Sequence, residues 1–174
     1  MATFLIANCQ FGRASVIESN DRPFESVHDM NTEMIERWNA VVAPEDEVIH
    51  LGNFAWDPTT AEEILTQLNG NIQLVPAEYD QPILELNAKG ILPKRVRVVN
   101  RIFEIASVNA TFSYWPMLEW PSKSKGHFLF YGYYGKEYKP DHVKKMINMS
   151  CEFWNYTPHN IHTLNRLFED KDFQ

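Results

Sequence analysis

The 174-residue sequence lacks any long apolar run. No stretch approaches the roughly 18 apolar residues of a membrane-spanning helix, and the N-terminus lacks the basic and apolar regions of a secretory signal peptide. Repeats, low-complexity tracts and interdomain linkers are also missing. We therefore expect one domain over residues 1–174 that is cytoplasmic and has no membrane partner.

Cysteine and positive charge are also scarce. Cys9 and Cys151 are the only cysteines and do not form a Cys-x-x-Cys motif, so we expect two reduced thiols. The chain has 16 Lys and Arg against 23 Asp and Glu, a formal net charge of -7. Proteins that bind nucleic-acid phosphates usually have the opposite balance, so we do not expect nucleic acid as a partner.

The first half of the sequence alternates strand and helix signals. Short apolar runs predict strands at 4–7, 47–51 and 72–75. Between them, Ser26 followed by Asp29 resembles a capping box that begins an amphipathic helix. We expect Thr59 or Thr60 to cap a second helix. This β-α-β-α-β order predicts parallel strands.

The second half is rich in strands. Alternating residues predict two hairpin-linked strands, 95–100 and 102–108. Further elements are expected at 110–112, 127–131 and 146–150, with a helix over 161–168. The sequence therefore predicts an α/β fold, a βαβ half followed by a β-rich half, with sandwiched sheets flanked by helices.

In order and spacing these segments resemble the calcineurin-like metallophosphoesterases, specifically the small single-domain members of phages and bacteria. The resemblance extends over nearly the whole chain. It rests on Phe11-Gly12, Arg22-Pro23-Phe24, Met30-Asn31, Trp38-Asn39, His50-Leu51-Gly52, Leu68-Asn69-Gly70, Pro116-Met117-Leu118 and Trp154-Asn155-Tyr156-Thr157-Pro158. It implies the calcineurin-like fold, and in the family this fold holds two divalent cations that drive phosphate-ester hydrolysis.

The resemblance places other residues at the family's metal-ligand positions. The first Asp-x-His pair falls on Asn8 and Gln10, and the bridging Asp falls on Asn53. The Gly-Asn-His-Asp block falls on residues 77–80, where Glu78 and Tyr79 replace two members and Asp80 is retained. The remaining ligand histidines fall on Tyr114, Tyr133 and Gly135.

These replacements remove the chemistry that two cations require. Neighbouring divalent cations need anionic ligands and imidazole lone pairs. Asn8 and Asn53 remove both carboxylates, and a tyrosine with an ordinary pKa of about 10 is neutral at pH 7. Glu78 alone does not make a dinuclear centre. We therefore expect no metal, no other cofactor and no catalysis, which describes a pseudoenzyme.

The kind of relative implies a phage accessory protein that binds or inhibits a host protein in the host cytoplasm, with a homo-oligomer possible. One alternative is a weak phosphodiesterase or phosphatase that uses Glu78, Asp80 and amide ligands for one Mg²⁺ or Mn²⁺. Another is a metal-free nucleotide sensor. Analysis of bound metal separates the first alternative from the other hypotheses.

Aromatic residues are abundant, and five of them should converge where the family holds its metals. They are Tyr114, Trp115, Tyr131, Tyr133 and Tyr134. These rings either fill the abandoned cavity or form a recognition surface for a protein partner, and a stacking pocket for a nucleobase is a third interpretation. We expect Tyr114 and Tyr131 to be buried and Tyr134 to be exposed.

Three further candidates have ordinary structural explanations. Cys9 lies within the first ligand block, but no His is placed by sequence to activate it, so we expect a small buried side chain. We expect His50 to be a hydrogen-bonded scaffold residue rather than a remnant of the metal site. His159 and His162 are expected on a solvated helical face.

Overall fold

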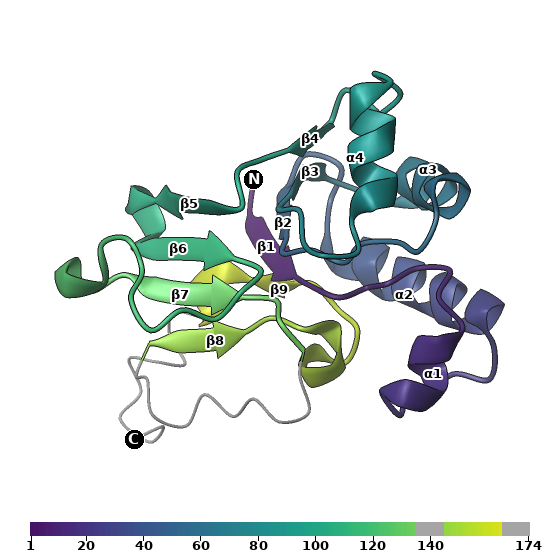
Figure 1. Cartoon of the computed structure of the whole chain (residues 1–174), viewed down its shortest axis with the longest axis horizontal. Helices are drawn as coiled ribbons and strands as arrows, with labels where there is room; N and C mark the ends of the chain where they lie inside the picture. The colour runs from purple at the N-terminus through teal and green to yellow at the C-terminus, as the bar shows by residue number, and fades with distance from the viewer. Residues whose placement is uncertain (135–144, 165–174) are drawn as a thin grey trace.

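The structure is a computed structural model that describes residues 1–134 and 145–164 (Figure 1). The helices are α1 (Ser15–Ser19), α2 (Val27–Val41), α3 (Pro58–Gln67) and α4 (Gln81–Ala88). The strands are β1 (Thr3–Ile6), β2 (Glu47–His50), β3 (Asn71–Leu74), β4 (Val96–Val98), β5 (Ile102–Ile105), β6 (Ala110–Ser113), β7 (Phe128–Tyr131), β8 (Met146–Asn148) and β9 (His159–Asn160). Short 3-10 helices lie at Ala106–Val108, Lys123–Lys125 and Cys151–Trp154.

The first sheet has the strand order β4-β3-β2-β1-β9. Strands β1 to β4 are parallel, and β9 runs antiparallel to β1. One face of this sheet packs against α2, α3 and α4 (Figure 1) through a buried apolar cluster that includes Ile6, Val48, Trp38 and Ile64. Burial of these side chains holds the helices on the sheet.

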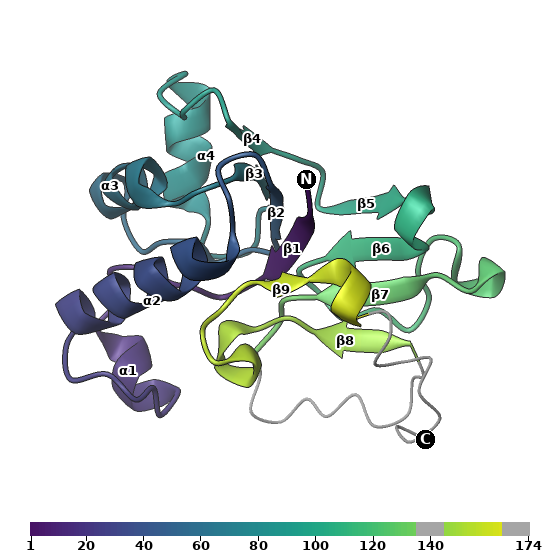
Figure 2. The ribbon, with the colours of Figure 1, turned by 180° about the vertical axis from the view of Figure 1, so that it is seen from behind.

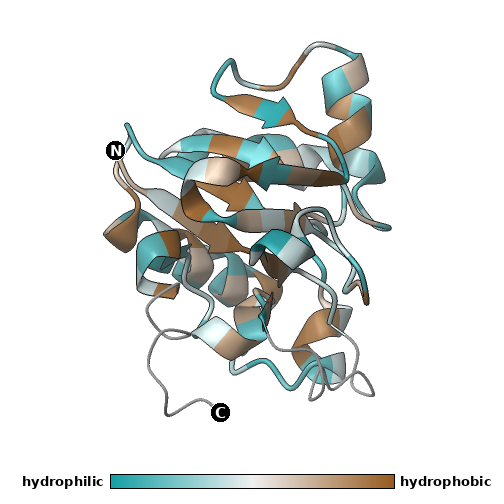
Figure 3. Cartoon of the chain, turned by 90° about the vertical axis from the view of Figure 1, so that its left-hand side faces the viewer, coloured by the Kyte–Doolittle hydropathy of each residue, from teal (hydrophilic) through white to brown (hydrophobic). Residues whose placement is uncertain are grey.

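The second sheet has the order β5-β6-β7-β8, with β5 antiparallel to β6 and the other pairs parallel. It covers part of the other face of the first sheet, as Figures 1 and 2 show from opposite sides. Leu5, Ile49, Phe112 and Phe130 meet in the buried cluster between the sheets. Hydrophobic residues accordingly gather in the strands at the centre of the molecule (Figure 3).

The chain therefore has a mixed α/β fold with two mixed sheets flanked by helices, which confirms the α/β class and the order of its halves. The parallel strands of the first half are confirmed within one residue at each end. Ser26 caps α2 by accepting a hydrogen bond from the backbone N–H of Asp29. The Asp29 carboxylate bonds the N–H of Glu25 instead of closing a capping box.

The expected cap of the second helix is wrong. Asp57 is the N-cap of α3, and its carboxylate accepts a hydrogen bond from the backbone N–H of Thr60. Pro58 occupies the first turn, where its fixed φ and missing N–H are tolerated. The Asp-Pro pair is therefore a start signal that the sequence contained. The sequence reading also missed two helices, α1 and α4.

The expected hairpin between 95–100 and 102–108 is also wrong. β4 pairs with β3 in the first sheet, whereas β5 pairs with β6 in the second. Alternating residues identify a strand but not its partner, and here the link crosses between sheets. The last expected strand ends at Asn148. Residues 161–164 are helical, and the rest of that expected helix lies outside the described residues.

No helix within the described residues is both long enough and apolar enough to span a membrane. The two sheets approach each other closely beside Gly132. A Cβ atom at Gly132 would lie 2.8 Å from the Cβ of Ala7 and would collide with the backbone carbonyl of Leu51. Glycine at this position is therefore needed for the close approach of the two sheets.

The inter-sheet core should carry a large share of the stability. Phe112 is fully buried and stacks between Phe103 and Phe130 at centroid distances of 5.0 and 5.7 Å. We expect Phe112→Ala to lower the free energy of unfolding by about 3–5 kcal/mol. Phe153→Ala, at a ring that is 61% exposed, is the matched control and should change it by less than about 1 kcal/mol. Urea denaturation measures both, and equal losses would contradict the sandwich.

Candidate functional site

The candidate site lies where β1 and β2 end. Their following loops run side by side, and backbone hydrogen bonds of 2.9 Å join Asn8 N to Gly52 O and Gln10 N to Asn53 O. Asn8, Gln10 and Asn53 all have left-handed backbone conformations, with φ of 55°, 49° and 56°. Asparagine tolerates this conformation better than most residues, so the loop geometry favours Asn at two of these positions.

Two buried asparagine amides bond to each other at the centre of the site. The Asn53 Nδ2 donates to Asn8 Oδ1 at 2.9 Å and to Tyr114 Oη at 2.8 Å. Asn8 Nδ2 in turn donates to Ser150 Oγ at 3.0 Å and to the carbonyl of Gly132. We call Asn8, Asn53, Tyr114 and Ser150 the amide network. This network joins the loops that follow strands of both sheets. The amide nitrogens of Asn8 and Asn53 each donate two hydrogen bonds within it or to the neighbouring backbone.

Asp80 organises the neighbouring loop. Its buried carboxylate accepts hydrogen bonds from the backbone N–H groups of Asn53, Phe54 and Ala77, each at 2.7 Å. These bonds fix the loops after β2 and β3 against each other. Because the carboxylate oxygens of Asp80 already accept these three hydrogen bonds, Asp80 supports the loops of the site and is not a free acceptor.

A buried ion pair supports the network from the other side. Arg22 Nη2 lies 2.6 Å from Glu152 Oε1, and the Arg22 side chain also donates to the carbonyls of Asn8 and Cys9. Ser150 Oγ donates to the second oxygen of Glu152. Burial raises the pKa of Glu152, but the Arg22 charge and the Ser150 hydrogen bond outweigh burial, and the net pKa is lowered. A continuous chain of hydrogen bonds thus runs from this pair to Asn53.

The cysteines lie together behind the network, although 141 residues separate them in the sequence. Both are free and fully buried, and Cys151 Sγ donates to the backbone carbonyl of Asn8, the residue before Cys9, at 3.3 Å. Burial raises the pKa of Cys9, but the neighbouring Cys151 and His50 outweigh burial and lower the value to about 6. Cys9 nonetheless has no exposed surface for a substrate to reach, which fits the expected buried side chain.

The expected environments of the histidines need correction. His50 is buried and packs edge-on against Phe54 at 5.1 Å between ring centroids. Neither ring nitrogen of His50 forms a hydrogen bond of regular geometry within the described residues, so packing and the neighbouring Cys9 hold it. His159 is half-buried in β9, where burial lowers its pKa. Of His159 and His162, both expected on a solvated helical face, His162 alone is exposed.

A cavity of about 150 Å³ opens above the amide network. Its lining residues are Asn8, Gln10, Arg13, Val16, Ser19, Asn20, Asn53, Tyr79, Tyr114 and Tyr134. Arg13 lies at its edge, with its guanidinium carbon 4.4 Å from the Trp56 ring centroid and 4.9 Å from that of Tyr79. Arg13 Nη1 also donates to Gln10 Oε1 at 2.6 Å. The cavity is therefore polar at its base and partly aromatic at its mouth.

The five expected aromatics do not converge at one place, although Tyr133 packs against the group that contains Tyr131. Tyr114, Trp115 and Tyr133 form one cluster, with Trp115 and Tyr133 stacked at 5.1 Å. Tyr131 is buried, as expected, but it packs with Trp120 and Met146 on the outer face of the second sheet and does not line the cavity. The preceding residue, Phe130, faces the core between the sheets, because side chains alternate along a strand.

Burial distinguishes the remaining rings. Tyr114 is 5% exposed, as expected for a side chain that fills the site, and burial raises its pKa despite the Asn53 hydrogen bond. Its phenol is therefore neutral at pH 7. Tyr134 is partly exposed and lies 5.7 Å from Phe153 between ring centroids, so its ring is less exposed than expected. Trp115 is 43% exposed.

The residues at the positions where the resemblance places metal ligands do not fit a two-metal centre. The amides of Asn8 and Asn53 direct N–H groups at their neighbours, Glu78 is exposed, and Tyr79 is 44% exposed. Within residues 1–134 and 145–164, no group of three or more His, Cys, Asp or Glu could hold a metal. Gly135 lies outside the described residues.

Sequence reasoning missed the residues that support the site. Arg22 belongs to the Arg-Pro-Phe motif, but nothing in the sequence paired it with Glu152. Ser150 and Arg13 carried no signal beyond their positions after a predicted strand and after Phe11-Gly12. A search for buried Arg and Glu partners requires the fold, because residues 22 and 152 are distant in the chain.

Comparisons with known proteins support the fold more than the chemistry. No family model matches the sequence. The chain is 26% identical over 179 residues to the uncharacterized protein MJ1445 of Methanocaldococcus jannaschii, covering 95% of this chain and 90% of that protein. It also resembles the crystal structure of AQ665, a protein of unknown function from Aquifex aeolicus, with a TM-score of 0.71 at 19% identity and coverage of 95% and 98%. The structural likeness shows a shared fold.

Introducing a carboxylate at the centre of the site should destabilise the protein. Asn53→Asp removes the hydrogens donated to Asn8 and Tyr114 and buries a charge. We expect the free energy of unfolding to fall by about 2–4 kcal/mol. Asn109→Asp is the matched control, because Asn109 is also left-handed, with φ of 49°, but is exposed; its change should stay within about 0.5 kcal/mol.

Urea melts measure these two changes, and calorimetric titration with Mn²⁺ completes the test. The double variant Asn8→Asp, Asn53→Asp should bind no Mn²⁺ tightly, because Tyr114 and Tyr133 stand where imidazoles would be needed. Tight binding of two Mn²⁺ ions by the double variant would show that two carboxylates suffice to rebuild a centre.

The buried ion pair predicts a pH dependence. We expect Glu152→Gln to lower stability at pH 7 by about 3–5 kcal/mol, since it leaves Arg22 buried without a counter-charge. The pKa of Glu152 is lowered below its ordinary value of 4.5 in the folded protein, so the stabilisation is present above pH 4.5 and is lost as the pH falls through the lower, folded-state pKa. The difference in the free energy of unfolding between wild type and Glu152→Gln, measured by urea denaturation, should therefore narrow only below pH 4.5. A gap that stays constant to pH 3 would disprove the linkage.

Proposed function

We propose that this protein has a calcineurin-like metallophosphoesterase fold without metal-dependent catalysis and that it acts by binding a protein partner. One observation carries the proposal. At the position of the bridging carboxylate, Asn53 donates hydrogen bonds to Asn8 and Tyr114. Hydrogen bonds then hold together the loops that cations hold in the family, and a donor stands where a cation would need an acceptor.

The arrangement around the cavity supports a binding role. Four rings that line the cavity or contact its lining residues are substantially exposed, and they are Trp56, Tyr79, Trp115 and Phe153, at 50%, 44%, 43% and 61%. Trp56 and Tyr79 flank Arg13, Trp115 packs on Tyr114, and Phe153 packs on Tyr134. Aromatic and Arg side chains are enriched in the cores of protein interfaces. We call these four rings the aromatic rim.

The narrower proposal is a phage protein whose partner is a host factor in the host cytoplasm. It rests on the resemblance to small phage phosphoesterases. The similar proteins of M. jannaschii and A. aeolicus belong to cellular organisms, so the binding role itself requires only a partner in the same cell. A weak single-metal hydrolase has less support, because Asp80 is occupied by three backbone donors and Glu78 is exposed.

A metal-free nucleotide sensor is the second candidate. The cavity of about 150 Å³ and the guanidinium of Arg13 at its edge favour it. Acidic residues around the cavity disfavour a bound nucleotide, because they would repel its phosphates. Glu78 and Asp80 are close enough to Tyr114 to contribute to its raised pKa, and Asp21 and Glu152 do the same for Tyr134. A nucleotide that raises the melting temperature in a concentration-dependent way, with an effect that Arg13→Ala abolishes, would favour the sensor.

The partner should bind through the aromatic rim. We expect Trp115→Ala to weaken partner binding by at least about 2 kcal/mol, or roughly 30-fold in Kd, with stability nearly unchanged. Tyr114→Ala should instead lower stability by about 3–5 kcal/mol, because this ring is buried. Affinity capture from lysate with wild-type and Trp115→Ala baits identifies candidates that bind only the wild type, and titration of the purified candidate gives the Kd.

Two controls separate binding from residual catalysis. Leu118→Ala, at a residue that is 76% exposed and outside the rim, should leave the Kd within threefold. Hydrolysis of p-nitrophenyl phosphate and its bis ester is measured with and without added Mn²⁺, and we expect none. Metal-dependent turnover that Glu78→Ala abolishes would overturn the pseudoenzyme proposal. A folded Trp115→Ala, Tyr133→Ala variant with wild-type affinity would place the interface elsewhere.

A further inference from the structure

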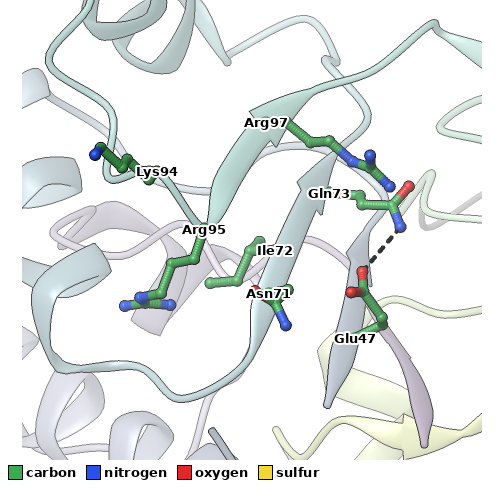
Figure 4. A pocket seen from close by; sticks show the side chains of 7 residues that line it. All are labelled: Glu47, Asn71, Ile72, Gln73, Lys94, Arg95 and Arg97. Carbon is green, nitrogen blue, oxygen red and sulfur yellow. Dashed lines mark hydrogen bonds between the residues drawn. The ribbon is translucent and has the colours of Figure 1, made fainter. Parts of the chain in front are cut away.

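A second pocket lies at the opposite end of the first sheet from the candidate site. It has a volume of about 160 Å³ and is lined by Glu47, Asn71, Ile72, Gln73, Lys94, Arg95 and Arg97 (Figure 4). Glu47 and Asn71 begin β2 and β3, whereas the amide network follows the ends of β1 and β2. The two sites therefore do not share residues, and one can be tested without the other.

The sequence around this pocket is strongly basic. Residues 86–103 contain no Asp or Glu, and their basic residues are Lys89, Lys94, Arg95, Arg97 and Arg101. This stretch runs against the chain's formal charge of -7. At the pocket itself, three cations and one carboxylate give the lining a formal charge of +2. Such a local reversal of charge concentrates anions at that surface.

The cations of the pocket are not neutralised by carboxylates of the described residues. Arg95 is held in place by neutral acceptors, since it donates to the carbonyls of Gly70, at 2.7 Å, and Leu65. Burial lowers its pKa, which reflects the desolvation of its guanidinium. Lys94 and Arg97 are exposed and take part in none of the ion pairs among the described residues.

Polar side chains of the first sheet complete the pocket. Figure 4 shows Arg97 directed toward Gln73 of β3, whereas Lys94 and Arg95 directly precede β4 and point to its other side, away from Arg97. Gln73 Nε2 donates to Glu47 Oε2 at 3.1 Å, so the one carboxylate of the lining, on β2, is engaged by an amide of the neighbouring strand β3. Glu47 and the negative charge of the whole chain disfavour a long polyanion there and favour a small one.

We propose that this pocket binds the phosphate group of a small phosphorylated molecule, with Arg97 as its main cationic contact and with Lys94 adding positive charge from the other side of β4. A phosphate monoester has a charge of about -1.5 to -2 at pH 7, which matches the lining. The planar fork of arginine suits two phosphate oxygens, and the lysine ammonium adds a point charge. Arg95 contributes charge from a fixed position. The proposal does not depend on the proposed function.

Thermal unfolding of the full chain in a phosphate-free buffer tests the pocket. The probes are inorganic phosphate and adenosine 5′-monophosphate, each compared with sodium chloride at equal ionic strength. We expect both to raise the melting temperature above the chloride control. The half-maximal concentration should increase at least tenfold in Lys94→Gln, Arg97→Gln, and several-fold in each single variant.

Lys89→Gln is the matched control, because Lys89 is an exposed basic residue of the same stretch that does not line the pocket. Its half-maximal concentration should stay within twofold of wild type. Since Lys94 and Arg97 are exposed, their variants should melt at the wild-type temperature without phosphate. If the double variant melts at a lower temperature, the two single variants provide the test. A response equal to that of chloride, or one retained in the variants, would overturn the proposal, as would tighter binding of a single-stranded oligonucleotide than of the monophosphate.

Discussion

The hydrogen bond from Asn53 to Asn8 is the contact on which the arrangement of the loops depends. This bond joins the loops after β1 and β2. The same two amides also donate to Tyr114 and Ser150, which follow strands β6 and β8 of the second sheet. Buried amides are stable only when their donors and acceptors are paired. The orientation of each side chain is therefore set by the next, from the Glu152 carboxylate through Ser150 to Asn53.

Charge is confined to the edges of this network. Arg22 compensates Glu152 behind it, and three backbone amides compensate Asp80 beside it. The centre contains only neutral amide, phenol and hydroxyl groups. A centre of this kind holds loops together at any metal concentration, which suits a protein whose proposed role is to present a fixed surface. It also explains why single carboxylates introduced there should be destabilising.

The two ends of the parallel strands have opposite character. The carboxyl ends lead into polar loops with an aromatic rim, and the amino ends of β2 and β3 lie beside a basic segment in an otherwise acidic chain. Ligands of α/β sheets usually bind at the carboxyl ends, so the basic pocket needs its own physical basis. Uncompensated guanidinium and ammonium groups supply one, because their charge is available to an anion from solution.

The sequence by itself determined the α/β class, the three parallel strands of the first half and the Ser26 cap, because local periodicity and capping chemistry act over a few residues. It also showed amides and phenols at Asn8, Asn53 and Tyr114. Only the tertiary structure decided that β4 and β5 belong to different sheets, that Tyr131 faces away from the cavity, and that Arg22 pairs with Glu152. Strand partners, side-chain direction and buried ion pairs depend on contacts between distant segments, and no local pattern in the chain records them.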